Sequence, residues 1–465
     1  MKLRARISAV LAFGLVATIG GVALGATADG GPATRNSVAY FAGGTRASSS
    51  MDPSPTLYET KFHSGEPTIG VDKKGDVFVT AEDVTSQPIP SQIDVLRSSD
   101  GGKSWVATNP AVGPQKTHPT TLDPYVFVDN LAGAHRVFTI DATAACAIAS
   151  YSDDEGATWM TNPIACDEPI TDHQTLFSGP AVGSTPVGYP NLVYYCYNDT
   201  ITASCAKSLD GGTTWVRTGT PAFVAFKGTT FCNNGLTGHG VAGADGTIYL
   251  PRNQCGQPEL AISHDEGATW AQIDVTGGKM KHVTGPDPAV AVDSKGNVYY
   301  VFIADKDRLP YLVVSHDEGK TWGKPLRIGP PGLKESDLPS IAVGSPGKIA
   351  IAFVGSENSP GAPFSASYAD VTWNGYVTTS TTALGTKPLF YSTIVNPKSD
   401  PIFRGHCGPG RCGSILDFID VTVAPDGTPW ASFVDACTGD CTKPGADKPV
   451  GDFGVVAKIG GISLR

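Results

Sequence analysis

The residues of this chain that could do chemistry are carboxylates, histidines and arginines at recurring places in a repeated pattern. The residues predicted to be catalytic are Asp123, His173, His239, Asp287 and Asp420. The residues predicted to bind substrate are Glu66, Arg252, Arg404 and Arg411. Two carboxyls beside a glycosidic bond can cleave it, one as the acid and the other as base or nucleophile. Alternatively, His173 or His239 could abstract a proton from a uronate whose charge Arg252 neutralises, which gives β-elimination.

An eight-residue repeat indicates how these residues are positioned. The pattern Ser-x-Asp-x-Gly-x-Ser/Thr-Trp occurs five times, and successive copies begin 54, 56, 55 and 52 residues apart. The copies occupy 98–105, 152–159, 208–215, 263–270 and 315–322. A near-constant pitch of this length indicates one structural unit repeated along the chain.

Each unit contains short apolar strands separated by turns. In the first unit, 67–72, 77–80 and 93–97 are predicted strands, and the eight-residue repeat leads into a fourth. Four short strands in about 54 residues are typical of one propeller blade. The first two strands recur at 124–129 with 137–140, 174–178 with 192–196, 240–243 with 247–250, 288–293 with 298–303 and 339–343 with 348–354.

The last two units depart from the pattern. The sixth lacks the eight-residue repeat but keeps Trp373, which lies 51 residues after Trp322 and so stays on the period. The seventh has strands at 419–423, 429–434 and 453–459, and its fourth strand is missing. We expect the segment 57–62 to close the ring by pairing there, because closure removes exposed strand edges.

These patterns predict an all-β chain with a single propeller of seven blades, each of four antiparallel strands. Seven pitches of about 54 residues account for most of the chain after its lead-in. Six blades are the alternative if one of the last two units is an insertion. The predicted segments are a signal peptide at 1–28, a flexible lead-in at 29–60 and the propeller at 61–465.

The repeats themselves are predicted to be structural. Their Asp can accept hydrogen bonds from its own turn, their Gly supplies an unusual backbone geometry, and their Trp packs between sheets. First strands begin, and second strands end, on the opposite side. Counting back six residues from the end of each first strand gives Glu66, Asp123, His173, Thr237, Asp287, Leu338 and Phe418. Two residues further along are Thr68, Tyr125, Thr175, His239, Ala289, Ser340 and Asp420.

These positions also have a purely structural interpretation. Glu66, Asp123 and Asp287 each precede a proline, and such a pair can simply open a strand after a turn. Arg404 and Arg411 flank a loop before the seventh unit and could be solvated loop residues.

The eight-residue repeat resembles the Asp-box, or bacterial neuraminidase repeat, of sialidase-like β-propellers. In those propellers the repeat turns lie opposite the active site, so the resemblance implies a glycan-active enzyme such as a glycoside hydrolase. Sialidases also carry a Phe/Tyr-Arg-Ile-Pro motif. That motif is absent here, and the nearest string, Leu250-Pro251-Arg252, does not match it. A polysaccharide lyase on the same fold and a non-catalytic binding propeller remain alternatives.

The chain also has features of an exported protein. Lys2, Arg4 and Arg6 precede an apolar run, and Ala26-Thr27-Ala28 is a small-x-small cleavage site, although an uncleaved anchor is the alternative. The ten cysteines suggest disulfides. Pairing between sequence neighbours is expected: 146–166, 196–205, 232–255, 407–412 and 437–441. A zinc site at Cys407, Cys412, Cys437 and Cys441 is the alternative.

The net charge of −10 argues against a nucleic-acid or anionic-membrane partner. We expect a monomer that binds a carbohydrate or glycoconjugate, without a cofactor, a bound metal or stable membrane insertion.

Overall fold

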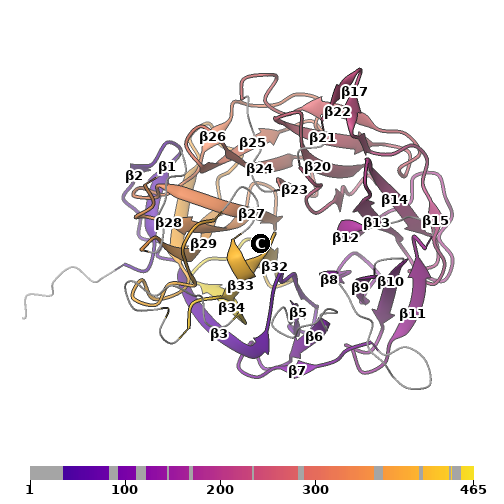
Figure 1. Cartoon of the computed structure of the whole chain (residues 1–465), viewed down its shortest axis with the longest axis horizontal. Helices are drawn as coiled ribbons and strands as arrows, with labels where there is room; N and C mark the ends of the chain where they lie inside the picture. The colour runs from indigo at the N-terminus through magenta and orange to yellow at the C-terminus, as the bar shows by residue number, and fades with distance from the viewer. Residues whose placement is uncertain are drawn as a thin grey trace, which may run out of the picture. The chain divides into compact units, whose positions relative to one another are not determined.

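Antiparallel sheets arranged around a central axis form the unit from Asn36 to Arg465 (Figure 1). The structure, a computed structural model, describes residues 35–82, 93–110, 122–143, 146–166, 171–232, 235–280, 287–360, 370–407, 412–438, 441 and 452–465. The predicted signal peptide at 1–28 lies outside the described residues. Within them, no helix has the length and apolar character needed to cross a membrane.

In the first sheets, strands that follow one another in the chain pair with each other. One sheet contains β4 (Ile69–Val71), β5 (Val77–Glu82), β6 (Ile93–Ser98) and β7 (Val106–Ala107). The next contains β8 (Leu122–Val128), β9 (Val137–Thr143), β10 (Cys146–Ser152) and β11 (Met160–Ile164). The third contains β12 (Asp172–Gly179), β13 (Leu192–Asn198), β14 (Thr202–Ser208), β15 (Val216–Arg217) and β16 (Phe223–Val224).

The chain then forms a hairpin and two further four-stranded sheets. The hairpin consists of β17 (Phe226–Lys227) and β18 (Thr230–Phe231). One sheet contains β19 (Val241–Ala242), β20 (Ile248–Gln254), β21 (Gln257–Ser263) and β22 (Ala271–Asp274). The other contains β23 (Ala289–Val292), β24 (Val298–Ala304), β25 (Leu309–Ser315) and β26 (Leu326–Arg327).

The last two sheets include strands from both ends of the chain. The larger one contains β27 (Glu335–Val343), β28 (Ile349–Ser356), β29 (Thr372–Ser380), β30 (Leu389–Ile394) and β31 (Phe403–Arg404), together with β1 (Val38–Phe41) and β2 (Thr45–Arg46). The other contains β32 (Asp420–Val423), β33 (Pro429–Asp435), β34 (Phe453–Gly460) and β3 (Ser54–His63). The short 3-10 helix η1 (Gly413–Ile415) precedes β32.

The ring is closed by an N-terminal strand, as predicted from the missing fourth strand. β3 pairs antiparallel with β34, and Tyr58 lies opposite Val456. Tyr58 also stacks on Trp430 of β33, with 6.3 Å between ring centroids. The first strands contact one another in the order β4, β8, β12, β19, β23, β27, β32 and back to β4. Each first strand is therefore held from both sides.

Two expectations need correction. β1 and most of β3 lie within 29–60, so this segment is part of the sheets rather than a flexible lead-in. Trp373 lies inside β29, the third strand of its sheet, and not in the turn after it. There it pairs with Phe403 of the added strand β31.

The five copies of the eight-residue repeat form one kind of turn, called here the repeat turn. It joins the third and fourth strands of five sheets. In the fourth copy, Oδ1 of Asp265 accepts the Thr269 N–H at 2.9 Å, and Oδ2 accepts the Thr269 hydroxyl at 2.6 Å. The Ser263 hydroxyl donates to Asp265 and accepts from the Gly267 N–H. These bonds recur in every copy, so their carboxylates are occupied within the turn.

All five disulfides join the cysteine pairs predicted from the sequence: 146–166, 196–205, 232–255, 407–412 and 437–441. The alternative of a zinc site is therefore wrong for Cys407, Cys412, Cys437 and Cys441.

The first repeat turn packs on the closing strand β3. Substitutions at two neighbouring glycines of this turn distinguish the packing contact from backbone strain. Both have positive φ, +75° at Gly101 and +94° at Gly102. A Cβ at Gly101 would meet nothing within 4 Å, whereas one at Gly102 would lie 2.6 Å from the Tyr58 ring. We expect Gly101→Ala to cost about 1 kcal/mol and Gly102→Ala at least twice as much. If Gly101→Ala and Gly102→Ala lowered the thermal unfolding midpoint equally, this packing contact would be contradicted.

Candidate active site

The side chains at the mouth of the ring are carried by an irregularity repeated at the start of the first strands. Glu66, Asp123, His173 and Leu338 all have positive φ, between 45° and 55°. The strand register slips at three of these four places, between Leu122 and Tyr125, Asp172 and Thr175, and Asp337 and Ser340. Bulges of this kind re-aim side chains that a regular strand would alternate between its two faces.

His173 lies among carboxylates. Its Nδ1 pairs with Asp287, and its Nε2 lies 3.3 Å from Oδ2 of Asp417. Its backbone N–H donates to Oδ2 of Asp123 at 2.9 Å and to Oδ1 of Asp172 at 3.1 Å. Carboxylates facing both ring nitrogens favour a proton on each. Burial alone would lower the pKa of His173, but Asp287, Asp417 and Asp123 raise it well above its usual value. The ring is therefore an imidazolium at neutral pH.

Glu66 and Asp172 both interact with Asp123, which helps to raise the pKa of each. Burial, followed by the charge and hydrogen bond of Asp123, raises the pKa of Glu66 well above its usual value. Burial and a hydrogen bond with Asp123 also raise the pKa of Asp172, to about 7. Glu66 is buried, and its Oε1 accepts the Asp417 N–H at 3.2 Å. Asp172 is partly exposed, so it is the group of this trio that can exchange a proton with a substrate.

His239 and Asp420 form a second part of the site, deeper along the axis. Burial, followed by the charge on His173, lowers the pKa of His239 to about 3, so this imidazole is neutral. Its Nδ1 lies 3.9 Å from Oδ1 of Asp420. Burial raises the pKa of Asp420 to about 6. The carboxylate accepts the Ile69 N–H and the Ser340 hydroxyl, which tie three sheets together.

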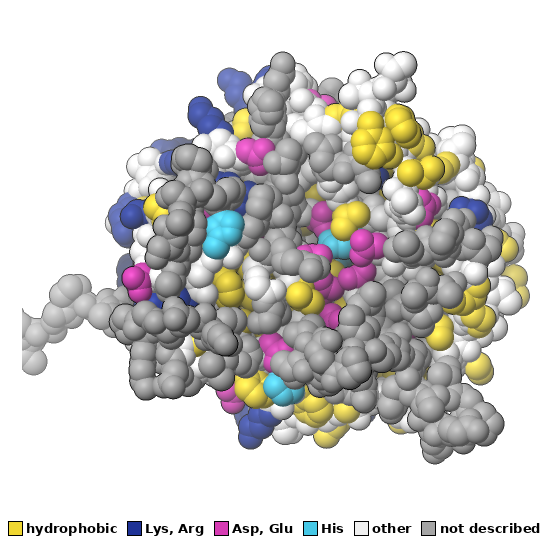
Figure 2. Space-filling model, viewed as in Figure 1, with side chains coloured by type: hydrophobic (Ala, Val, Ile, Leu, Met, Phe, Trp, Pro, Cys, Tyr) yellow, Lys and Arg dark blue, Asp and Glu magenta, His cyan; other side chains and the backbone are white. Residues whose placement is uncertain are grey.

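A pocket at the mouth lies above a cavity along the axis. The pocket is lined by His173, Gln174, Thr237, Gly238, His239, Asp287, Pro288, Ala289, Leu338, Pro339, Ser340, Asp417, Phe418 and Ile419. The cavity, of about 390 Å³, is lined by first strands and includes His239 and Asp420. The Phe418 ring lies 5.9 Å from His173 and 5.2 Å from His239. Acidic and histidine side chains are visible at the centre of this face (Figure 2).

Arg252 and Arg404 are not among the described residues that line this pocket. Arg252 is 2% exposed, and its Nε donates to the Gly235 carbonyl at 3.0 Å. Burial lowers its pKa, against the opposing charges of Asp287, Asp199 and Glu259. Arg404 donates to the Cys441 carbonyl at 2.9 Å. Arg411 lies outside the described residues.

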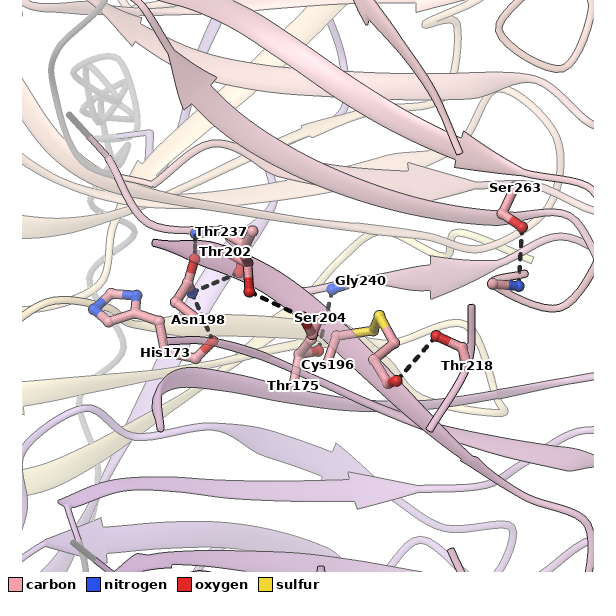
Figure 3. Close-up of a disulfide and its surroundings, with 12 residues drawn as sticks. His173, Thr175, Cys196, Asn198, Thr202, Ser204, Thr218, Thr237, Gly240 and Ser263 are labelled. Carbon is pink, nitrogen blue, oxygen red and sulfur yellow. Dashed lines mark hydrogen bonds between the residues drawn. A yellow bond between two sulfur atoms is a disulfide. The ribbon is translucent and has the colours of Figure 1, made fainter. Parts of the chain in front are cut away.

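The backbone around His173 is supported by the neighbouring sheet (Figure 3). Asn198, at the end of β13, donates to the hydroxyl of Thr237 at 2.8 Å and to the His173 carbonyl at 3.4 Å. The Thr175 hydroxyl accepts the Gly240 N–H at 3.1 Å. The Cys196–Cys205 disulfide joins β13 to β14 beside these contacts. The segment carrying His239 is thereby fixed against the strand carrying His173.

The structure brings together Glu66, Asp123, His173 and Asp287 and places His239 and Asp420 beside them. Two acidic residues were missed, Asp172 and Asp417. Each immediately precedes a position that was counted, His173 or Phe418. Counting one residue per strand assumes regular alternation, and the slip between Asp172 and Thr175 breaks that assumption. An acidic residue next to a counted position was the available signal.

Within the part of the chain that the structure describes, no group of three or more His, Cys, Asp or Glu side chains is arranged to hold a metal ion. The contacts described above are proton-mediated contacts among carboxyls and imidazoles.

Comparisons with known proteins add little beyond the fold. No protein-family model and no curated protein match the sequence. Solved structures that align with it include a Dyadobacter fermentans protein of unknown function, at 13% identity and a TM-score of 0.42, covering 87% of this chain and 97% of that one. A Hadza microbial sialidase aligns at 17% identity with a TM-score of 0.43, and the alignment covers 72% of this chain and 66% of that one. A Penicillium chrysogenum alpha-L-arabinanase complexed with arabinobiose aligns at 13% identity with a TM-score of 0.42, and the alignment covers 78% of this chain and 98% of that one. Likeness at this level carries no argument about activity.

The raised pKa values predict that stability falls as pH rises. Between about pH 4 and 7, folded Asp172 keeps a proton that the unfolded chain releases, so the free energy of unfolding decreases with pH. His173 acts in the same direction, because its contribution is full below pH 6.5 and is lost as pH rises through its folded pKa. Asp172→Asn should flatten the slope between pH 5 and 7 by up to about 1.4 kcal/mol per pH unit.

The measurement is chemical denaturation at a series of pH values, with Asp426→Asn as the matched control. Asp426 is an exposed turn residue whose carboxylate accepts its own turn's Thr428 N–H. The control should follow the wild-type slope. An unchanged slope in Asp172→Asn would show that Asp172 titrates as in the unfolded chain.

Proposed function

We propose that this protein is an exported glycoside hydrolase acting on a neutral glycan at the mouth of the ring. The observation that carries the proposal is Asp172, a partly exposed carboxyl whose pKa of about 7 suits a general acid near neutral pH. It directly precedes His173, which Asp287 and Asp417 flank, and the charge on Asp417 contributes to its raised pKa. Glycosidic cleavage requires an acid with a raised pKa together with a second carboxyl.

In this mechanism Asp172 donates its proton to the glycosidic oxygen as the bond from that oxygen to the anomeric carbon breaks. Asp287 serves as the base that takes a proton from the attacking water, or as the nucleophile that bonds to the anomeric carbon before water releases it. The hydrogen bond and charge of Asp123 help to raise the pKa of Asp172 and so keep the acid protonated. His173 orients Asp287 and Asp417 and balances part of their charge.

The charge around the pocket supports a neutral substrate. No Lys or Arg is among its described lining residues, and both nitrogens of the His173 imidazolium already face carboxylates. A sialic acid or uronate carboxylate in the pocket would meet Asp287 and Asp417, and the described lining residues offer it no Lys or Arg. Substrate binding by Glu66 also has little support, because its side chain is buried and bonded.

Hydrolysis is supported over β-elimination by the states of the two histidines. His173 is protonated and cannot accept a proton, and His239, with a pKa of about 3, is a weak base. Asp420 would support the pocket floor through its bonds to Ile69 and Ser340. His239 and Asp420 could have a catalytic role only if the substrate entered the cavity along the axis.

We also propose a blade count, a membership among repeat propellers and a location for the chain. Counting each first strand in the closed contact ring as one blade supports seven blades, with β1, β2 and β31 as additions to the sixth. The bonding of the repeat turns supports membership of the Asp-box propellers. Five disulfides support an oxidising, extracellular location for the chain.

The test is release of reducing ends from a panel of neutral polysaccharides (linear arabinan, xylan, galactan and mannan) and two acidic ones (polygalacturonate and polysialic acid). We expect cleavage of a neutral polymer without a new double-bond absorbance. Asp172→Asn and Asp287→Asn should each lower kcat by about 10²–10⁴-fold, whereas Asp426→Asn should leave it unchanged. Cleavage restricted to an acidic polymer, or full activity in both site variants, would overturn the proposal.

A further inference from the structure

The β17–β18 hairpin exposes two aromatic side chains to solvent. Phe226 and Phe231 are 51% and 60% exposed, although large apolar side chains of this fold are mostly buried. They lie directly opposite each other in the hairpin, and their rings pack edge to face with centroids 5.1 Å apart. We call these two residues the aromatic pair. Since the pair contributes little to any core, its exposure calls for another explanation.

The aromatic pair lies on the same face as the acidic pocket. Its hairpin is held at strand ends that point away from the repeat turns: the Ala225 N–H donates to the Ile201 carbonyl, and Gln254 donates to the Val224 carbonyl. Figure 2 shows hydrophobic side chains gathered over the position of β17, on the face whose centre carries the acidic and histidine side chains.

The hairpin is also fixed in place. Cys232, the residue after Phe231, is disulfide-bonded to Cys255 in the turn between β20 and β21. The Cys232 N–H donates to the Ala225 carbonyl, and Lys227 pairs with the carboxylate of Glu259 on β21. The aromatic pair is therefore presented on a tethered support, which limits the entropy that a bound ligand would have to remove.

Chain continuity joins the pair to the pocket. Phe231 stands six residues before Thr237, which lines the pocket beside His173 and His239. Six residues span at most about 20 Å. The two places are therefore close enough for one extended chain of a few sugar units to contact both, with apolar sugar faces on the aromatic rings.

We propose that the aromatic pair is a remote subsite that binds a neutral glycan chain by stacking against its sugar rings, so that the substrate is a polymer rather than a single terminal sugar. This rests on the proposed function, since the chain's other part would lie in the acidic pocket. Sugar C–H groups carry partial positive charge and pack on the negative faces of aromatic rings. Lys227 is engaged by Glu259, so the subsite favours an uncharged ligand.

A protein partner suits this surface less well. A stable protein interface needs about 20–30 residues on each side. The large exposed apolar side chains on and beside the hairpin are Ile201, Val224, Phe226 and Phe231, which is far fewer. A patch of this size matches a narrow, linear ligand.

The experiment compares the double variant Phe226→Ala/Phe231→Ala with wild type. Binding is measured first, by affinity electrophoresis in gels containing each polysaccharide of the panel, in an Asp172→Asn background that cannot cleave. We expect the double variant to lose at least about tenfold in affinity for the neutral polymer that wild type cleaves. In the active background, KM for that polymer should rise about tenfold, while kcat/KM for a short aryl glycoside of the same sugar stays within about twofold.

Val216→Ala is the matched control. Val216 is 53% exposed, but it lies just after a repeat turn on the opposite face. It should behave as wild type in both assays. The thermal midpoints of all variants should agree, because none of these side chains is buried.

The outcomes separate this proposal from the hydrolase proposal. Polymer binding without cleavage, lost in the double variant, would uphold the subsite and overturn the hydrolase. Polymer cleavage with unchanged binding and KM in the double variant would overturn the subsite alone. A dimer in wild type that becomes monomeric in the double variant would also overturn it, because the aromatic pair would then serve self-association. Absence of both binding and cleavage would overturn both proposals.

Discussion

The structure depends on closure of the ring by the pairing of β3 with β34. Every first strand packs between two neighbours, and the last sheet obtains its fourth strand only from the N-terminal part of the chain. Tyr58 of the closing strand packs on Trp430 and also touches the first repeat turn at Gly102. Closure therefore joins the two ends of the chain and leaves no edge between the last sheet and the first.

The site inherits its geometry from this closure. Glu66 stands before the first sheet and Asp417 before the last, yet the carboxylate of Glu66 accepts the Asp417 N–H. His173 then connects Asp417 to Asp287 across the mouth. If the ring opened, these groups would separate and the carboxyls would return to ordinary solvation. The unusual protonation states of Glu66, Asp172 and His173 are thus properties of the closed ring.

Much of the fold could be predicted, because it is encoded in local patterns. The repeat fixed the positions of five third-to-fourth strand turns, the missing strand indicated closure by 57–62, and neighbouring cysteines paired as expected. The additional strands β1, β2 and β31 could not be predicted, since they are short and lie outside the period. Trp373 stays on the period yet lies within a strand, so spacing alone does not give the place of a residue in its unit.

The sequence was enough to predict which residues lie at the strand ends of the site. It was not enough to predict which side chains contact one another there. Strand counting selected Glu66, Asp123, His173 and Asp287, which do meet, because it depends only on the propeller's symmetry. Which of them carries a proton depends on burial and on contacts between sheets far apart in sequence, and the sequence contains no local signal for those. His173 and His239 illustrate this: carboxylates surround the first and raise its pKa, whereas burial against Tyr125 and Phe418 lowers the pKa of the second. The same residue type therefore has different charge states at the starts of adjacent first strands, and only the first can anchor a pair of carboxylates.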